Sequence, residues 1–147
     1  MFSGRVLVLV LASGLLAGLA GCVSTRGELS SSTHRLEYNS HLLAEDAGAV
    51  SGSAEYPTNY ARDSAALADD ARELRHAAEG GTTADVQAAF DRVSRAYHAV
   101  RDEVEHSDSL QARNELRPVT AAYRDVENDL GYPPPQARVD NTVPEDR

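Results

Sequence analysis

Three apolar stripes of equal length recur along this chain at a constant offset of 26 residues. Tyr60, Val86 and Ala112 begin the stripes, and each continues in alternating steps of four and three residues. This spacing places the side chains on one face of an α-helix. Three helices of one length and register can bury such faces only against one another. The pattern therefore predicts an all-α fold, a small antiparallel helical bundle of three to four helices.

A further helix, ahead of the three stripes in the chain, is the weakest part of this prediction. Residues 32–50 carry a stripe in which a serine fills one step of the spacing; its members are Leu36, Ser40, Leu43, Ala47 and Val50. We therefore expect the bundle to occupy residues 32–130. Residues 22–31 are rich in Ser, Thr and Gly, which predicts a flexible tether before it.

Turn and cap residues mark the ends of the predicted helices. Pro57 lies just before a candidate cap at Thr58 or Asn59, and Gly80-Gly81 would end the same helix. Thr82 with Asp85 three residues later has the spacing of a capping box. These signals predict short connections between neighbouring antiparallel helices.

Pro118 lies within the last stripe and leaves two alternatives open. It either kinks a helix that runs from about Ser109, with Asp108 as a possible cap, or belongs to the first turns of a shorter helix capped by Asn114. Beyond that helix, residues 131–147 begin with Gly-Tyr-Pro-Pro-Pro and continue as a polar, mostly acidic segment. We predict a disordered Pro-rich C-terminal tail there.

The last two stripes resemble each other most closely over residues 93–100 and 119–126. An ancient duplication would explain this, and so would convergence of two antiparallel helices that face one core. Tyr97 and Tyr123 are the largest groups on these stripes. We predict that both are core anchors whose hydroxyl groups reach a partner at the edge.

The N-terminal segment has the layout of an export signal. A short stretch with Arg5 precedes an apolar run over residues 6–16, and small residues follow up to the only cysteine, Cys22. The apolar run is shorter than the about 20 residues that a transmembrane helix requires. The sequence Leu19-Ala20-Gly21-Cys22 resembles the lipobox of bacterial lipoproteins.

That resemblance implies cleavage after residue 21, attachment of a diacylglyceryl group to Cys22, and a further acyl chain such as palmitate on the new amino terminus. Two or more chains anchor a protein stably, so we expect attachment to the membrane without a spanning helix. In this family an Asp after the cysteine favours retention in the inner membrane. Val23 stands there instead, which favours the outer membrane, on its periplasmic side.

Composition excludes one class of partner. Without residues 1–21 the chain has 126 residues, and its 13 Arg stand against 23 Asp and Glu, a net charge near −10. Nucleic-acid binding requires a basic face, so we expect no nucleic-acid partner. The remaining length suffices for one domain.

No catalytic, cofactor or metal site is predicted from the residue pattern. On the predicted helices all five histidines fall outside the apolar stripes: His34, His41, His76, His98 and His106. His34 and His41 are separated by about 10.5 Å along a helix, too far to share one ion. His98 with Asp102, and Asp102 with His106, would supply two ligands each, whereas structural zinc takes four and catalytic zinc three from the protein.

These observations favour a non-catalytic, lipid-anchored envelope protein that acts as a structural or protein-binding module. We expect it to contact the membrane through its lipid and to have an envelope protein as partner. The alternative is a periplasmic helical bundle that binds a metal or a small molecule.

Overall fold

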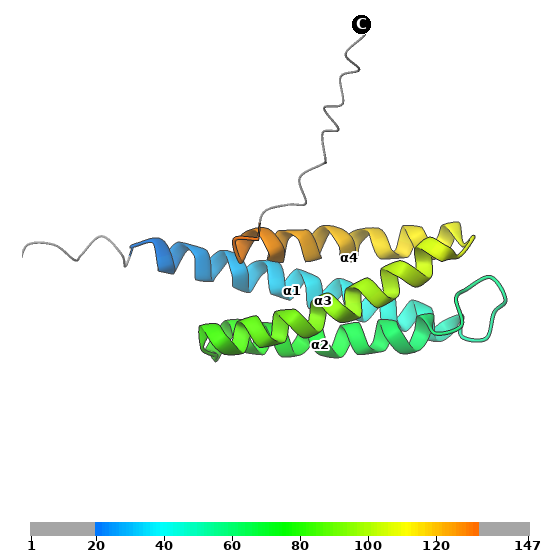
Figure 1. Ribbon diagram of the computed structural model, residues 1–147, viewed down its shortest axis with the longest axis horizontal. Coiled ribbons are helices and arrows are strands. Elements are labelled where there is room, and N and C mark those ends of the chain that lie inside the picture. The colour runs from blue at the N-terminus through cyan, green and yellow to red at the C-terminus, as the bar shows by residue number, and fades with distance from the viewer. Residues whose placement is uncertain (1–19, 133–147) are drawn as a thin grey trace, which may run out of the picture.

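The computed structural model describes residues 20–132, with side chains from residue 27 onward, and contains four α-helices in that range. They are α1 (Ala20–Ala49), α2 (Tyr60–Gly80), α3 (Thr83–His106) and α4 (Leu110–Asp129). Successive helices run antiparallel, as Figure 1 shows. The predicted all-α bundle is confirmed, with four helices rather than three.

Helix α1 is the central element. It packs against both α2 and α4, and α2 packs in turn against α3. The backbones of α3 and α4 approach each other least closely of the four neighbouring pairs. In Figure 1 the α1–α2 loop and the α3–α4 connection lie at one end, which we call the loop end. The first turns of α1 and the last turn of α4 lie at the opposite end.

The predicted stripes form the core. Every predicted stripe position of α2 is buried, as are the stripe positions of the other helices except Val50, Val86 and Leu130, which are partly buried. One cluster joins residues from all four helices. Because each helix has one apolar face, closing the bundle removes all four faces from water together.

Small side chains line the contact of α1 with its neighbours. Ser32, Thr33 and Ser40 on α1 are fully buried, as is Ala71 on α2. The Ser32 and Thr33 hydroxyls each donate to a carbonyl oxygen three residues earlier, at 3.0 Å. This bond satisfies the buried hydroxyl within its own helix. Ser32 and Thr33 can therefore lie in this interface with satisfied hydroxyls, whereas the Ser40 Oγ atom has no hydrogen-bond partner among the described residues.

Aromatic rings fill the space between α3 and α4. Tyr97 and Tyr123 stack at a centroid distance of 4.2 Å, and Phe90 stacks on Tyr123 at 5.7 Å. The Tyr97 hydroxyl donates to Thr120 on α4, while the Tyr123 hydroxyl donates to Ser94 on α3. The prediction that both tyrosines are buried anchors with partners at the edge is confirmed, with exposed fractions of 4% and 3%.

Local hydrogen bonds fix the helix ends that the sequence marked. The Thr82 hydroxyl accepts from the Asp85 amide, and the Asp85 carboxylate accepts from the Thr82 amide, so the predicted capping box is confirmed. The Thr82 amide and hydroxyl both donate to this carboxylate, which lowers the pKa of the Asp85 carboxyl group. Asn59 caps α2 by position, without a side-chain cap bond.

The start of α1 differs from the prediction. We expected a helix from Ser32 after a flexible tether over residues 22–31, yet α1 begins at Ala20 and runs through that segment. Leu29 packs partly against the core, and the buried hydroxyls of Ser32 and Thr33 are bonded within the helix. Residues 22–31 are therefore part of the helix, and the prediction of a flexible tether there is wrong.

Helix α4 resolves the alternatives at Pro118. The helix runs from Leu110 through Pro118 to Asp129, and Ser109 caps it by accepting from the Ala112 amide. The longer helix is therefore present, with Ser109 rather than Asp108 as its cap, and Asn114 lies within it.

A Schellman motif ends α4. Gly131 adopts a φ of +78°, while the Tyr132 amide donates to the Glu127 carbonyl and the Gly131 amide to that of Asn128. The Tyr132 ring then stacks on Phe90 at 5.3 Å, and the Gln87 side-chain amide donates to its hydroxyl. Residues 131 and 132, assigned to the tail, thus belong to the bundle.

The remaining terminal predictions, the signal segment up to residue 19 and the tail over 133–147, lie outside the described residues. Within residues 20–132, none of the four helices combines the length and apolar character needed to cross a membrane.

The turn between α2 and α3 supplies a stability test. A Cβ atom on Gly81 would lie 2.7 Å from the Ala77 carbonyl oxygen, whereas one on Gly80 would meet nothing within 4 Å. We expect Gly81→Ala to lower the free energy of unfolding by about 1–3 kcal/mol. Gly80→Ala, the control, should raise it by about 0.5–1 kcal/mol. Urea unfolding followed by circular dichroism measures both, and equal effects would contradict the prediction.

Candidate functional site

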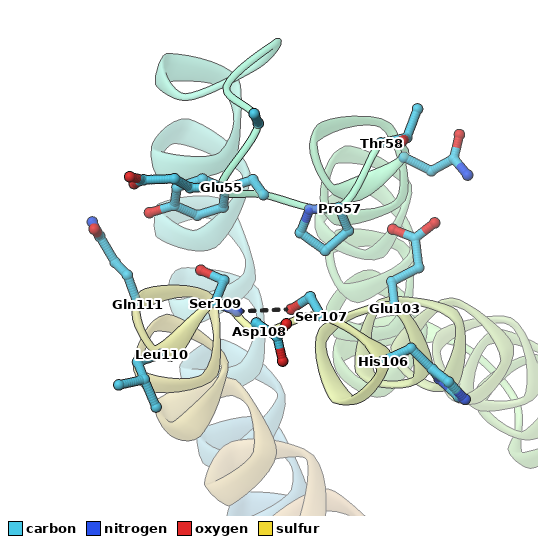
Figure 2. Close-up of a pocket in the computed structure, with 13 residues that line it drawn as sticks. Glu55, Pro57, Thr58, Glu103, His106, Ser107, Asp108, Ser109, Leu110 and Gln111 are labelled. Carbon is cyan, nitrogen blue, oxygen red and sulfur yellow. Dashed lines mark hydrogen bonds between the residues drawn. The ribbon is translucent and has the colours of Figure 1, made fainter.

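A cavity of about 810 Å³ lies at the loop end. The α1–α2 loop forms one wall through residues 54–59, and residues 103 and 106–111 around the α3–α4 connection form the other. Figure 2 shows Glu103 pointing towards Pro57, whereas the side chains of His106 and Leu110 point away from the cavity. The cavity exists because both connections end at the same side of an antiparallel bundle.

A carboxylate on α4 holds the loop in place. The hydroxyl groups of Tyr56 and Tyr60 donate to the two carboxylate oxygens of Glu115, each at 3.1 Å. The two rings lie 5.5 Å apart between centroids. Tyr56 belongs to the loop and Tyr60 begins α2, so these bonds join three parts of the chain. We call Tyr56, Tyr60 and Glu115 the tyrosine clamp.

The clamp changes the acidity of its phenols. Burial and the neighbouring Glu115 carboxylate raise the pKa of Tyr56 to about 12. The same two causes raise the pKa of Tyr60 further above its ordinary value. Desolvation disfavours the phenolate, and a nearby negative charge disfavours it again. Both hydroxyls are therefore protonated donors at neutral pH.

Acidic side chains predominate around the cavity. Glu55, Glu103 and Asp108 line it, and the Glu103 Oε2 atom is buried without a hydrogen-bond partner among the described residues. His106 lies at its edge and donates from Nδ1 to the Asp102 carbonyl oxygen at 2.6 Å. Leu110, 71% exposed, presents an apolar side chain at the loop end on the side that faces away from the cavity. The loop end thus offers an acidic surface with one apolar contact point.

A second hollow of about 470 Å³ lies between α3 and α4. Tyr97, Val104 and Leu116, all buried, form its apolar floor. Four of the ten lining residues are arginines, one on α3 and three on α4: Arg101, Arg113, Arg117 and Arg124. We call this hollow the arginine groove. Its charge is opposite to that of the loop end.

The histidines make separate contacts in the structure. His34 pairs with Glu79 at 3.1 Å and His41 with Glu45 at 3.4 Å, although both line one hollow between α1 and α2. His98 lies beside the Tyr97 ring, and His76 contacts Arg75. Within residues 27–132, no group of three or more His, Cys, Asp or Glu side chains is placed to hold a metal ion.

Cys22, the predicted lipid-attachment residue, has its backbone in the first turn of α1. Its side chain lies outside the described part of the chain. Its place in the helix puts it at the end of the bundle opposite the loop end (Figure 1).

The sequence did not indicate the tyrosine clamp. Tyr56 and Tyr60 are 59 and 55 residues from Glu115, so no local spacing connects them. Glu115 is also one of many acidic helix residues. Only the burial of Tyr60 was predictable, because this residue begins the α2 stripe.

Comparison with protein-family models, with curated proteins and with solved structures found no match for this chain. The functional argument therefore depends on its own residues and geometry.

The clamp predicts a graded loss of stability. Tyr60 is 1% exposed, so Tyr60→Phe removes a buried hydrogen bond to a charged group and should lower the free energy of unfolding by about 1.5–3 kcal/mol. Tyr56→Phe should cost less because Tyr56 is only partly buried. Tyr38, 64% exposed, provides the control Tyr38→Phe, which should cost little. Urea unfolding measures all three.

The same variants test how the stability of the protein depends on pH. Because folding raises both phenol pKa values, the unfolded chain releases these protons first as pH rises. The resulting stabilisation is complete below pH 10.0, the ordinary pKa, and falls as pH rises from there towards the folded value, about 12 for Tyr56. Tyr60→Phe should flatten this alkaline decline. An unchanged decline would contradict the role assigned to the clamp.

Proposed function

We propose that this chain is a lipid-anchored, non-catalytic protein-binding module of the bacterial envelope, attached through Cys22 to the periplasmic side of the outer membrane. One observation carries the proposal. Helix α1 is continuous from the position of Cys22 to Ala49, beside the loop end. At 1.5 Å per residue this helix separates the attachment point from the loop-end cavity by about 40 Å. The position of Cys22 and this cavity therefore lie at opposite ends of the bundle.

The helical start of α1 supports a defined orientation. With cleavage after residue 21, the helix begins at the lipidated residue, and its core contacts begin by Leu29. A helix is stiffer than the flexible tether that composition suggested. The loop end would thus be presented away from the membrane, where a partner in the periplasm can reach it.

The chemistry of the loop end favours a protein partner. An exposed leucine and acidic groups at this end combine an apolar anchor with charges that steer association and contribute specificity. The clamp holds the α1–α2 loop against α4, which reduces the ordering cost of binding. Four hydroxyl groups between α3 and α4 form hydrogen bonds within the bundle, which supports a structural role for them. They belong to Ser94, Tyr97, Thr120 and Tyr123.

The anchor is tested by Cys22→Ala. We expect this variant to leave the membrane fraction, because no thiol remains to accept the diacylglyceryl group. Ser24→Ala is the control and should stay in the membrane. Fractionation with detergent phase partitioning and mass measurement of the mature amino terminus checks both. An unlipidated wild-type chain would overturn the anchoring proposal.

The partner surface is tested by a photo-crosslinking residue at Leu110. We expect one discrete adduct in native membranes, reduced when Cys22 is replaced, because the anchor sets where the loop end lies. Leu42, 40% exposed on α1, provides the control position. A matching adduct from Leu42, or none from Leu110 in correctly lipidated protein, would contradict the assignment of the loop end.

A further inference from the structure

The charge of the arginine groove is opposite to that of the whole chain. The protein has 23 acidic residues and 14 Lys plus Arg, for a net charge of −9, yet the groove contains four arginines and one acidic residue, Glu105. Arg113, Arg117 and Arg124 lie along one exposed face of α4, and Arg101 faces them from α3. The groove is therefore a local basic surface on an acidic protein.

Three of these arginines lack a charged partner among the described residues, and one of the three, Arg113, is held by a backbone carbonyl. Arg101 pairs with Asp102 at 2.9 Å and with Glu105 at 3.4 Å, and Arg113 donates to the Ser107 carbonyl oxygen. Arg117 and Arg124 make no ion pair with any residue in the range 27–132. A guanidinium group matches a carboxylate with two parallel hydrogen bonds. Arg117 and Arg124 can thus bind an external anion without breaking an existing ion pair.

The shape of the groove favours an elongated ligand. Arg113 and Arg124 are eleven positions apart on one helix, about 16 Å along the axis. An exposed ion pair contributes only about 0–1 kcal/mol, so one small anion would be held weakly. A chain that also places apolar side chains on Tyr97, Val104 and Leu116 gains several contacts at once.

We propose that the arginine groove is a docking site for an acidic amphipathic segment of a partner protein. The carboxylates of that segment pair with Arg117 and Arg124, and its apolar side chains pack on the floor between α3 and α4. This helix-in-groove mode resembles the way many grooves receive amphipathic peptides. The inference rests on the proposed protein-binding role and does not depend on the lipid anchor.

The test uses a labelled amphipathic peptide with Leu on one face and Glu on the other, titrated into the full chain in uncharged detergent. Fluorescence anisotropy should show saturable binding that weakens as salt is added. Arg117→Glu and Arg124→Glu should each weaken binding by about fivefold or more, since each replaces attraction by repulsion. Arg95→Glu is the matched control, an exposed α3 arginine outside the groove lining, and should change affinity little.

A second pair of variants separates groove shape from charge. Ala121 is exposed and lines the groove, so Ala121→Trp fills it without changing charge and should also weaken binding. Ala99, exposed on α3 outside the groove lining, provides the control Ala99→Trp. Circular dichroism checks that all variants remain helical.

Three results would overturn the inference. In the first, the peptide either fails to bind the wild type or binds the wild type and all the charge variants equally. Soluble dihexanoyl phosphatidylglycerol binds in an Arg117-dependent manner while the peptide does not, which assigns the groove to a lipid. Truncation after Tyr132 creates peptide binding that the full chain lacks, which assigns it to this chain's own last residues. In each case a Leu110 adduct would leave the proposed function standing.

Discussion

The unequal size of side chains in the helix interfaces determines the shape of this bundle. Ser40 on α1 and Ala71 on α2 are fully buried, and small side chains of this kind permit the close approach of these two helices. Between α3 and α4 the stacked rings of Tyr97 and Tyr123 hold the backbones further apart. In a ring of four helices, close contact at α1 and wide separation on the other side leave a hollow between α3 and α4. The arginine groove is a consequence of that difference.

The aromatic interface also explains the internal similarity of the sequence. Ser94 and Thr120 are 26 residues apart, as are Tyr97 and Tyr123, and each tyrosine bonds to the hydroxyl residue of the opposite helix. Two antiparallel helices that contact each other through equivalent faces require the same small and large residues at matching heights. The repeated pattern therefore follows from reciprocal packing, and both duplication and convergence remain compatible with it.

Periodic features were predictable from the sequence, and contacts between distant residues were not. Leu67 and Val93 were assigned to the core because their spacing is local and repeats. Composition predicts a linker over residues 22–31, whereas the carbonyls of Leu29 and Ser30 in that segment accept from the Ser32 and Thr33 hydroxyls within one continuous helix. Glu115 was missed because its role depends on the position of a loop more than fifty residues away.

The clamp connects the two surfaces of opposite charge. Glu115 lies on α4 between Arg113 and Arg117, and it holds the loop-end wall through two phenols while the arginines face the groove. Any displacement of α4 relative to the α1–α2 loop would strain these bonds. The acidic loop end and the basic groove are therefore held in a fixed relation by one helix. Under the proposed protein-binding function, such preorganisation would lower the ordering cost for a partner that contacts both surfaces.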